Sequence, residues 1–321
     1  MSAVRVLVTG AGGPAGVAVI RSLLRRDDVE VFAADMDGWA SGLYMVPPTH
    51  RRTVPPGRSE QFVDVVRAMV TGDRLDAIVS TVDVELLALA ARRDELGAIL
   101  VAPSAEALTT CLDKWLLVHA CQGAARVPET ALLTAEGVAR DWTFPVLVKP
   151  RAGAGSRGVH VIESRAALEA MPLDEAILIQ EYLPGEEYSV DVLMGEAGNA
   201  IAAVPRLRAR VDSGVAVAGR TVNRADLRDA AEALARAAGI VGVANVQLRE
   251  TADGVPALLE INPRFSGSMP LTVAAGADMP SLVLDQSLGR PIPDHVDVAE
   301  VAVVRYLEDI FVPVESIIEA P

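Results

Sequence analysis

The segment VANVQLRETADGVPALLEINPRFSGS, residues 243–268, carries the most specific pattern in this chain. It holds two apolar strands joined by the Asp-Gly dipeptide at 253–254, which is typical of a tight turn. Glu260 and Asn262 are two residues apart in the second strand, so their side chains point to the same face. We expect Gln247, on the first strand, to be their cross-strand neighbour. The fold alone gives little reason for a polar Glu-x-Asn-Pro-Arg sequence at the end of an apolar strand. This sequence therefore indicates a functional site.

The donor atoms of these side chains suit a magnesium ion. Glu260 offers a carboxylate, and Gln247 and Asn262 offer amide oxygens, which together make the kind of oxygen-only set that Mg²⁺ takes in proteins. Such a site also keeps positions for water and phosphate oxygens. Arg264 comes two residues after Asn262 and can bind a phosphate through its planar guanidinium. We therefore predict a metal site at Gln247, Glu260 and Asn262.

A second motif, FPVLVKPRAGAGSRGVHVI at 144–162, reads as strand, Lys-Pro, glycine loop and strand. Glycines in such a loop let backbone N–H groups come close to an anion. Lys149, at the root of the loop, can reach a phosphate. The chain has 27 arginines and two lysines, Lys114 and Lys149, which suggests that lysine is kept where a compact ammonium is needed. Glycine hairpins without a ligand are also common, so the loop alone decides nothing.

A third motif, ILIQEYLPGEEYSVDV at 177–192, is a strand that bends at Pro184 and Gly185 and continues as a strand. We expect such a bend to expose backbone groups between two domains. Glu186 and Glu187 can accept hydrogen bonds from sugar hydroxyls, although acidic residues in a turn are usually only solvated.

The opening VLVTGAGGPAG, residues 6–16, resembles a dinucleotide-binding turn, and Asp35 at the end of the next strand could meet a ribose. Glycines there also allow tight turning and close helix packing without a ligand. No tyrosine has a lysine four residues after it, the pair that short-chain dehydrogenases need. No GxxxxGK[ST] sequence is present either. Hydride transfer and a Walker-type phosphate loop are therefore disfavoured.

The length of 321 residues predicts two or three domains. Strands and helices alternate over residues 1–103, which predicts a parallel, doubly wound sheet of α/β class. An exposed loop is expected at 42–58, and a second loop is expected to hold Asp212, Gly214 and Gly219. Residues 225–238 form a strong helical pattern that stops at Gly239.

Composition excludes several classes of protein. The net charge of −14 argues against nucleic acid as the main partner, because duplex binding depends on neutralising phosphates. No stretch approaches the roughly 18 apolar residues of a membrane helix. The start reads as a strand and a glycine turn rather than a signal peptide. The chain has two cysteines, Cys111 and Cys121, which argues against a framework of disulfides. A reducing cytoplasm is therefore the expected location.

With these motifs in this order, the chain resembles the ATP-grasp superfamily, and within it the synthetase halves of the carbamoyl-phosphate synthetase large subunit. The resemblance runs from about residue 4 to 293. It implies a Rossmann-like pre-ATP-grasp domain at 1–103 that binds no NAD. It further implies a two-lobed ATP-grasp module, with a small lid subdomain at 104–183 and a C-terminal α+β subdomain at 184–321. ATP and Mg²⁺, with Mn²⁺ as a substitute, are the implied cofactors, and related enzymes are often homodimers.

The resemblance also assigns roles to single residues. Lys149 and Lys114 would hold the ATP phosphates, and 153–158 would form the lid loop. Asn245 and Arg264 would lie beside the transferring phosphate. The metal ligands would be Gln247, Glu260 and Asn262, where Gln247 replaces the acidic residue of many family members and matches the carbamoyl-phosphate synthetase type. The remaining nucleotide-binding positions are Gly153, Gly155, Ser156 and Gly158 of the loop, Gln180, Glu181, Tyr182 and Leu183 near the adenine, and Glu187 at the ribose.

The function that we expect is a carboxylate–amine (or thiol) ligase that works through an acyl phosphate and releases ADP and phosphate. The segment VPRLRARVDSGVAVAGR, residues 204–220, would recognise the acceptor's carboxylate through a basic cluster, although each arginine alone could be a solvated edge charge. The cluster consists of Arg206, Arg208, Arg210 and Arg220. Carboxyphosphate or carbamoyl phosphate formation from bicarbonate is one alternative. A nucleotide-binding regulatory module without turnover is another. The identity of the small-molecule carboxylate and amine stays open.

Overall fold

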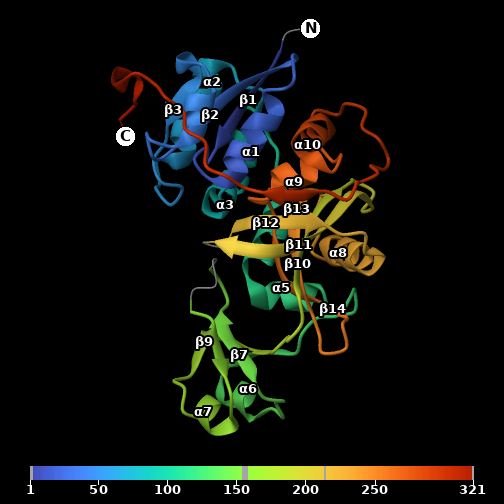
Figure 1. Cartoon of the computed structure of the whole chain (residues 1–321). Coiled ribbons are helices and arrows are strands. Elements are labelled where there is room, and N and C mark those ends of the chain that lie inside the picture. Colours follow the sequence, from blue (N-terminus) through green and yellow to red (C-terminus); the bar gives the residue numbers. More distant parts are fainter. Residues whose placement is uncertain (1–2, 154–157, 213–214, 320–321) are drawn as a thin grey trace.

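A computed structural model describes residues 3–153, 158–212 and 215–319 of the chain (Figure 1). Gly155 and Ser156 of the expected lid loop, and Gly214 of the expected second loop, lie outside these ranges. The described residues form three sheets, two at one end of the molecule and one in a lobe at the other end.

The first sheet has the strand order β3-β2-β1-β4-β5, and all its pairings are parallel. Its strands are β1 (Val4–Thr9), β2 (Val29–Asp35), β3 (Arg51–Thr53), β4 (Ala77–Ser80) and β5 (Ile99–Leu100). The helices that follow strands are α1 (Pro14–Leu23), α2 (Phe62–Asp73) and α3 (Asp83–Ala91). The prediction of a parallel α/β sheet is confirmed. The expected loop at 42–58 is wrong in part, because it contains the three-residue edge strand β3, whose Arg-Arg-Thr sequence has no apolar signal.

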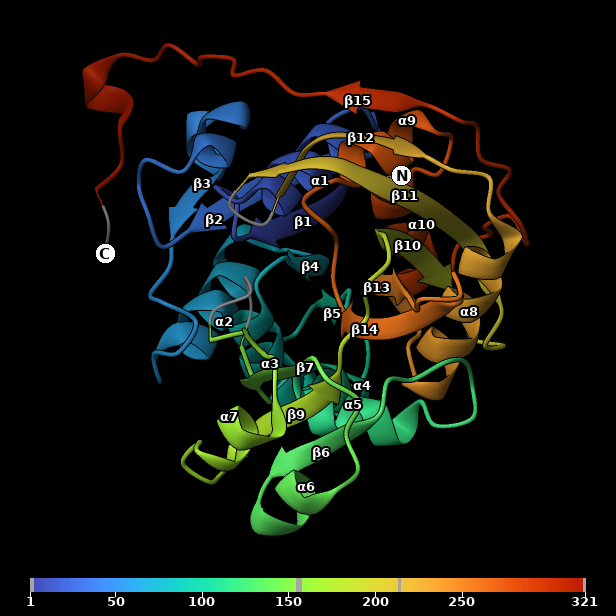
Figure 2. The same ribbon diagram turned by 60° about the horizontal axis from the view of Figure 1, so that its bottom comes forward.

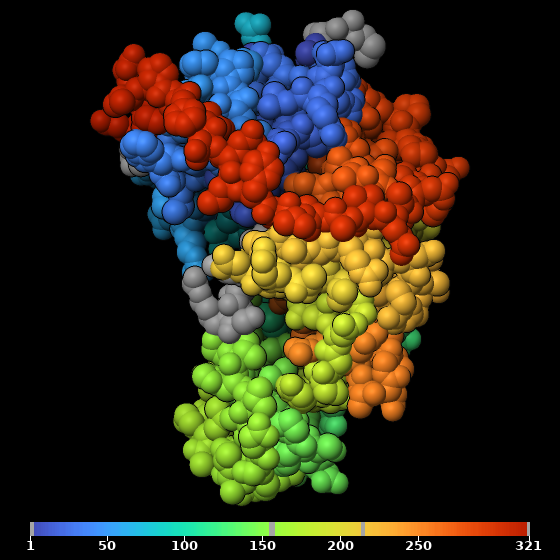
Figure 3. Space-filling view, in the orientation of Figure 1, coloured from blue at the N-terminus to red at the C-terminus, as the bar shows by residue number. Residues whose placement is uncertain are grey.

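The second sheet is antiparallel, with the order β6-β9-β7-β8, and forms the lobe that projects from the rest of the molecule (Figure 3). Its strands are β6 (Thr130–Leu133), β7 (Val146–Pro150), β8 (His160–Ile162) and β9 (Asp174–Glu181). Two short helices, α6 (Ala135–Ala139) and α7 (Arg165–Glu169), cover its small core around Trp142 and Leu168. Two helices precede the lobe in the chain, α4 (Ala105–Leu112) and α5 (Lys114–Ala120).

The third sheet is antiparallel, with the order β14-β13-β10-β11-β12-β15. Its strands are β10 (Glu187–Met194), β11 (Ala200–Asp212), β12 (Val215–Thr221), β13 (Gly242–Glu250), β14 (Pro256–Asn262) and β15 (Ala302–Val304). Helix α8 (Ala225–Ala237) packs on it through Leu227 and Leu234, both fully buried. The expected loop at Asp212 and Gly219 is wrong, because β11 runs to Asp212 and Gly219 pairs with Arg208 inside β12. Gly219 is needed in the strand, since a Cβ there would lie 2.7 Å from the backbone oxygen of Leu207.

One hydrophobic core joins the first and third sheets. It includes Val6 of β1, Ile20 of α1 and Val204 of β11, together with Met269 and Met279 of two later helices, all of them fully buried. Those helices are α9 (Met269–Ala274) and α10 (Met279–Ser287). The shared core fixes the two sheets relative to each other.

The last described residues run from β15 back to the first sheet, where Figures 1 and 2 show them beside β3. The backbone N–H of Ile318 donates to the Tyr44 hydroxyl at 3.3 Å, and Arg51 donates to the Ser316 carbonyl at 3.4 Å. The 3₁₀ turns are Ser41–Met45, Pro48–His50, Arg93–Glu95 and Val314–Ser316. No helix within the described part of the chain is long and apolar enough to span a membrane.

Candidate active site

The expected metal ligands lie together on neighbouring strands. Gln247 of β13 pairs directly with Glu260 of β14, which confirms the predicted cross-strand relation, and Asn245 pairs with Asn262. The Asn262 side-chain N–H donates to Glu260 Oε1 at 3.2 Å, and Arg264 Nη2 donates to Asn262 Oδ1 at 3.3 Å. Among the described residues, no cluster of three His, Cys, Asp or Glu side chains could hold a metal. A cation here would therefore depend on amide oxygens as well as on Glu260.

Both lysines approach the same place from other elements. Lys149 of β7 is 5 % exposed, and burial, assisted by the nearby positive charge of Lys114, lowers its pKa to about 8, while Glu260 opposes that shift. Lys114 begins α5, and its ammonium donates to the Gly153 carbonyl at 2.9 Å. Asp113 caps α5 by accepting from the backbone N–H groups of the next turn, and it pairs with Arg151 at 2.6 Å. These contacts fix Lys114 at the root of the glycine loop, next to the strand that carries Lys149.

A cavity of about 730 Å³, which we call the first cavity, lies between the lobe and the third sheet. Its polar lining includes Lys114, Lys149, Glu187, Gln247 and Glu260. Its apolar lining includes Leu147, Val159, Val161, Val211 and Leu259. An apolar space next to two lysines suits a ligand with an aromatic base and an anionic tail.

A second cavity, of about 700 Å³, lies between the carboxyl ends of the first-sheet strands and the third sheet. The first sheet and its loops contribute Gly10, Asp35 and Thr81, while the third sheet contributes Arg206 and Asn245. Among the described residues, three line both cavities: Arg208, Gln247 and Glu260. The two cavities therefore meet at the expected metal site.

The arginines of the expected cluster have different surroundings. Arg206 is 2 % exposed in the wall of the second cavity, and Arg208, which lines both cavities, forms an ion pair with Glu187. Arg210 and Arg220 are exposed and line neither cavity. The structure thus brings two of the four arginines to the site.

Arg206 is held by a residue that the sequence did not reveal, Asp191 of β10. Its Nη2 donates to Asp191 Oδ1 at 2.7 Å and to Ser266 Oγ at 3.1 Å. The same carboxylate, which is fully buried, accepts from Asn245 at 2.7 Å and from Thr272 at 2.5 Å. Arg206 Nε has no hydrogen-bond partner among the described residues. Asp191 therefore orients both Arg206 and Asn245 at the wall of the second cavity.

The expected hinge residues lie at and just after the end of β9, where Gln180 and Leu183 are buried and Glu181 and Tyr182 are half-buried. Gln180 donates to Thr130 Oγ1 at 2.9 Å, and the Glu181 carboxylate pairs with Arg126 at 2.6 Å. Tyr182 lines the first cavity, whereas the lining does not include Gln180, Glu181 or Leu183. In the loop, Gly153 and Gly158 both have positive φ, at 129° and 72°, which favours glycine at these positions.

The first sheet adds carboxylates that sequence reasoning missed. Asp83 forms an ion pair with Arg264 at 2.7 Å, which links α3 to the residues just after β14. Glu85 is 5 % exposed and accepts from Thr9 at 2.6 Å and from Ser80 at 2.8 Å, and its burial raises its pKa. A signal was available, because ligand sites of open parallel sheets form at the carboxyl ends of the strands, where these residues lie.

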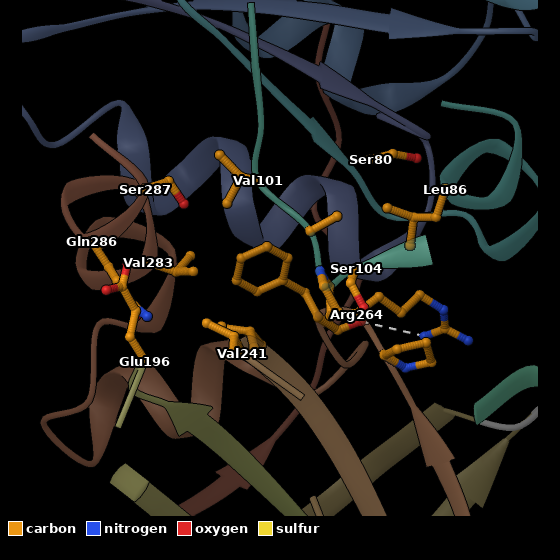
Figure 4. Close-up of a pocket in the computed structure, with 16 residues that line it drawn as sticks. Ser80, Leu86, Val101, Ser104, Glu196, Val241, Arg264, Val283, Gln286 and Ser287 are labelled. Carbon is orange, nitrogen blue, oxygen red and sulfur yellow. Dashed lines mark hydrogen bonds between the residues drawn. The ribbon is translucent and has the colours of Figure 1, made fainter. Parts of the chain in front are cut away.

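A third and smaller cavity, of about 160 Å³, shares Arg264 with the second cavity (Figure 4). In Figure 4, Arg264 and Ser104 lie at one side of the space and Gln286 and Ser287 lie at the opposite side. Gln286 donates to the Met194 carbonyl at 3.2 Å, while its buried Oε1 has no partner among the described residues.

Comparisons with known proteins agree with this architecture. Residues 174–310 match the family model described as ATP-grasp in the biosynthetic pathway with Ter operon. The carbamoyl phosphate synthase large chain of Mycobacterium sp. (strain JLS) is 29% identical over 212 residues, which cover 60% of this chain and 19% of that protein. The D-alanine–D-alanine ligase of Anaeromyxobacter dehalogenans (strain 2CP-C) is 34% identical over 172 residues, covering 48% of this chain and 52% of the ligase.

Solved structures share the fold. The biotin carboxylase domain of Hydrogenobacter thermophilus 2-oxoglutarate carboxylase, a complex with MgADP, ADP and bicarbonate, matches with a TM-score of 0.74 at 17% identity. The match covers 91% of this chain and 71% of that one. The chain shares with this structure the arrangement of a parallel sheet followed by two antiparallel sheets, and residues 174–310 match an ATP-grasp family model. It spans only 19% of the carbamoyl phosphate synthase and about half, 52%, of the D-alanine–D-alanine ligase that it matches.

Proposed function

We propose that this chain binds ATP with Mg²⁺ in the first cavity and uses it to activate a carboxylate in the second, as a carboxylate–amine (or thiol) ligase. The observation that carries the proposal is the meeting of the two cavities at Arg208, Gln247 and Glu260. A γ-phosphoryl group at this junction would be within reach of a substrate on the other side. In this proposal residues 1–103 supply one wall of the acceptor cavity, 104–183 supply the lid, and 184–321 supply the catalytic strands.

The nucleotide would lie with its base against the apolar side chains near Tyr182 and its phosphates toward Lys114 and Lys149. The buried ammonium of Lys149 is pre-positioned for an anion, and a phosphate would offset the cost of keeping its charge there. Glu187 is the proposed partner of the ribose. Its carboxylate would accept hydrogen bonds from the ribose hydroxyls while it keeps its ion pair with Arg208. Residues 153–158 remain the proposed lid, of which the structure describes Gly153 and Gly158.

The donor set fits a magnesium ion because it consists of oxygen ligands, Glu260 as the carboxylate and Gln247 and Asn262 as amides. Asn262 would turn its amide oxygen toward Glu260, which needs rotation about one side-chain bond. When bound, Mg²⁺ neutralises charge on the phosphate oxygens.

The chain's own residues would position the reactants for two displacements. A substrate carboxylate oxygen, oriented by Arg206 and Arg208, attacks the γ-phosphorus, and ADP leaves with the electrons of the broken P–O bond. The amine then attacks the acyl carbon, a C–N bond forms, phosphate leaves, and the nitrogen loses a proton. Arg264 and Asn245 are the proposed neighbours of the phosphoryl group. Positioning and charge neutralisation suffice for such chemistry, so no covalent nucleophile is needed.

Bicarbonate is the second candidate for the activated acid. The likeness to carbamoyl phosphate synthase favours it, as does the bicarbonate in the complex of the matching biotin carboxylase domain. The 700 Å³ acceptor cavity is far larger than bicarbonate requires, which favours an organic acid. A regulatory module that binds nucleotide without turnover would not need the Glu260, Asn262 and Arg264 set.

Hydroxylamine should intercept the acyl phosphate as a hydroxamate. The reagent is small and nucleophilic, so it can replace the amine in the second cavity. With a suitable organic acid, ADP and phosphate should appear in step with the hydroxamate, which a ferric chloride assay and chromatography of the nucleotides would measure. AMP and pyrophosphate would contradict the proposal. ADP release driven by bicarbonate alone would select the second candidate, and nucleotide binding without turnover on any acid would select the regulatory module.

Nucleotide affinity should fall as pH rises through the pKa of Lys149. This pKa is lowered to about 8, so the side chain is charged at pH 7 and largely neutral at pH 9. Because phosphate binds the charged form, affinity for MgATP should drop about tenfold between pH 7 and pH 9 in calorimetric titrations. Lys149→Arg keeps its charge and should bind more weakly, with a flat profile over this range. A flat profile for the unmodified protein would show that Lys149 does not contact the phosphates.

A further inference from the structure

We propose that the second cavity takes an amino acid, a substrate with an ammonium and a carboxylate group, and that Glu85 and Asp35 of the first sheet bind the ammonium. The inference rests on the proposed ligase function and adds the class of substrate to it. The carboxylate end would face Arg206 of the third sheet.

The lining of the second cavity has opposite charges on its two sides. Asp35 and Glu85 lie on the first-sheet side, whereas Arg206 and Arg208 come from β11 of the third sheet. The third sheet also contributes Glu260, the proposed metal ligand, and Arg264 follows its strand β14. Arg58, an exposed residue of the loop before α2, also lines the cavity on the first-sheet side. A ligand that bridges the cavity would therefore meet acidic groups at one end and guanidinium groups at the other, which complements a dipolar molecule.

Arg206 is the evidence for a ligand at the basic side. Its Nη2 is used by Asp191 and Ser266, but its Nε is buried and has no partner within the described part of the chain. A buried N–H donor without an acceptor is costly, so such donors are rarely left unpaired. A carboxylate in the second cavity would supply the missing acceptor and match the charge.

Glu85 is the corresponding evidence at the acidic side. Both hydroxyl donors, from Thr9 and Ser80, reach Oε2, and none of the described residues donates to Oε1 or forms an ion pair with this carboxylate. Burying a carboxylate without a cation is expensive. An ammonium group at Oε1 would relieve that cost.

The loop that precedes α2 and the turn after β1 hold these acidic groups in place. A Cβ at Gly57 would lie 2.6 Å from Glu85 Cγ, so this glycine lets the loop close over the side chain. Asp35 accepts from the backbone N–H groups of Gly12 at 2.8 Å and Asp37 at 3.0 Å. Both carboxylates are thus fixed before any ligand arrives, which lowers the entropic cost of binding.

A structural role for Glu85 is the competing explanation, because its contacts to Thr9 and Ser80 tie β1 to β4. The two explanations differ in whether the negative charge matters. Glu85→Gln keeps the size of the side chain and one oxygen acceptor for the two hydroxyls, but it removes the charge. A purely structural Glu85 would tolerate this change, whereas an ammonium site would not.

The experiment compares amino acids with matched acids that lack the amino group. Titration calorimetry of the full chain with MgADP present, and phosphate release with MgATP, would use three pairs of probes. These are L-alanine and propionate, L-leucine and 4-methylpentanoate, and L-phenylalanine and 3-phenylpropionate. The remaining standard amino acids, β-alanine and 4-aminobutyrate complete the panel. Glu85→Gln and Asp35→Asn are the test variants, and Asp64→Asn, an exposed position on α2 outside both cavities, is the matched control.

We expect at least one amino acid to bind and to be used about 10- to 100-fold better than its matched acid. Glu85→Gln should remove most of that preference by raising the KM for the amino acid, with the KM for ATP unchanged, and Asp35→Asn should act in the same direction. Asp64→Asn should behave like the unmodified chain. Equal use of both members of every pair, no response to any amino acid while nucleotide binds, or an unchanged preference in both test variants would overturn the inference. Absence of nucleotide binding would instead overturn the proposed function.

Discussion

Glu260→Ala should reduce turnover by roughly a hundred- to a thousandfold while MgATP affinity falls about tenfold or less. Glu260 is the one carboxylate among the three proposed metal ligands, and it lines both cavities at their junction. Charge that builds up during phosphoryl transfer would develop at this point, so the loss should fall mainly on kcat. Steady-state kinetics and calorimetry of the same preparation would separate the two effects.

The matched control is Asp253→Ala, which removes an acidic side chain from the exposed turn of the same β13–β14 hairpin. It should leave kcat unchanged. Asn262→Ala should act like Glu260→Ala but more weakly, because a neutral ligand is lost. Turnover and affinity should both be measured at pH 7. The negative charge of Glu260 raises the pKa of Lys149, so removal of Glu260 would lower that pKa further. Normal turnover in both Glu260→Ala and Asn262→Ala would place the metal elsewhere.

The sequence predicted the parts of the fold that local rules determine. The Asp-Gly turn predicted the β13–β14 hairpin, and Gln247 does pair with Glu260 as expected. That pair depends on an irregularity between Gln247 and Leu248, because the regular register that runs from the turn through Leu248 and Leu258 would place Gln247 opposite Leu259. Alternating strands and helices likewise predicted the parallel first sheet. The scarcity of lysine indicated Lys114 and Lys149, which the structure places near each other and near Glu260.

Other features depend on contacts between distant parts of the chain. Asp191 lies within a strand of apolar residues, and its partners are 15 to 81 residues away in the sequence, so nothing local marks it as a buried anchor. Glu85 faces Thr9 across 76 residues, because β1 and β4 pair as parallel neighbours. Gly219 looked like a loop residue, but it serves the close approach of β11 and β12. Burial and cross-strand partners, which decide these cases, are properties of the assembled sheets.

Asp191→Ala should destabilise the chain by about 3–5 kcal/mol, as judged by chemical unfolding followed by far-UV circular dichroism. The variant leaves the Arg206 guanidinium buried without its counter-charge, and it also removes the acceptor for Asn245, Ser266 and Thr272. A charge stranded in a protein interior costs far more than the ion pair contributes as a whole. The loss should therefore be much larger than for an exposed ion pair.

Two comparisons separate this explanation from general damage to the core. Glu232→Ala breaks the exposed pair with Arg236 on α8 and should cost less than about 0.5 kcal/mol. Combining Asp191→Leu with Arg206→Met replaces the buried pair with apolar side chains, so it should recover much of the stability that Asp191→Ala loses. The double variant should nonetheless fail to use the acceptor, because it lacks the guanidinium that faces the second cavity. If the double variant were as unstable as Asp191→Ala, loss of the hydrogen bonds to Asp191, and not the stranded charge, would explain the cost.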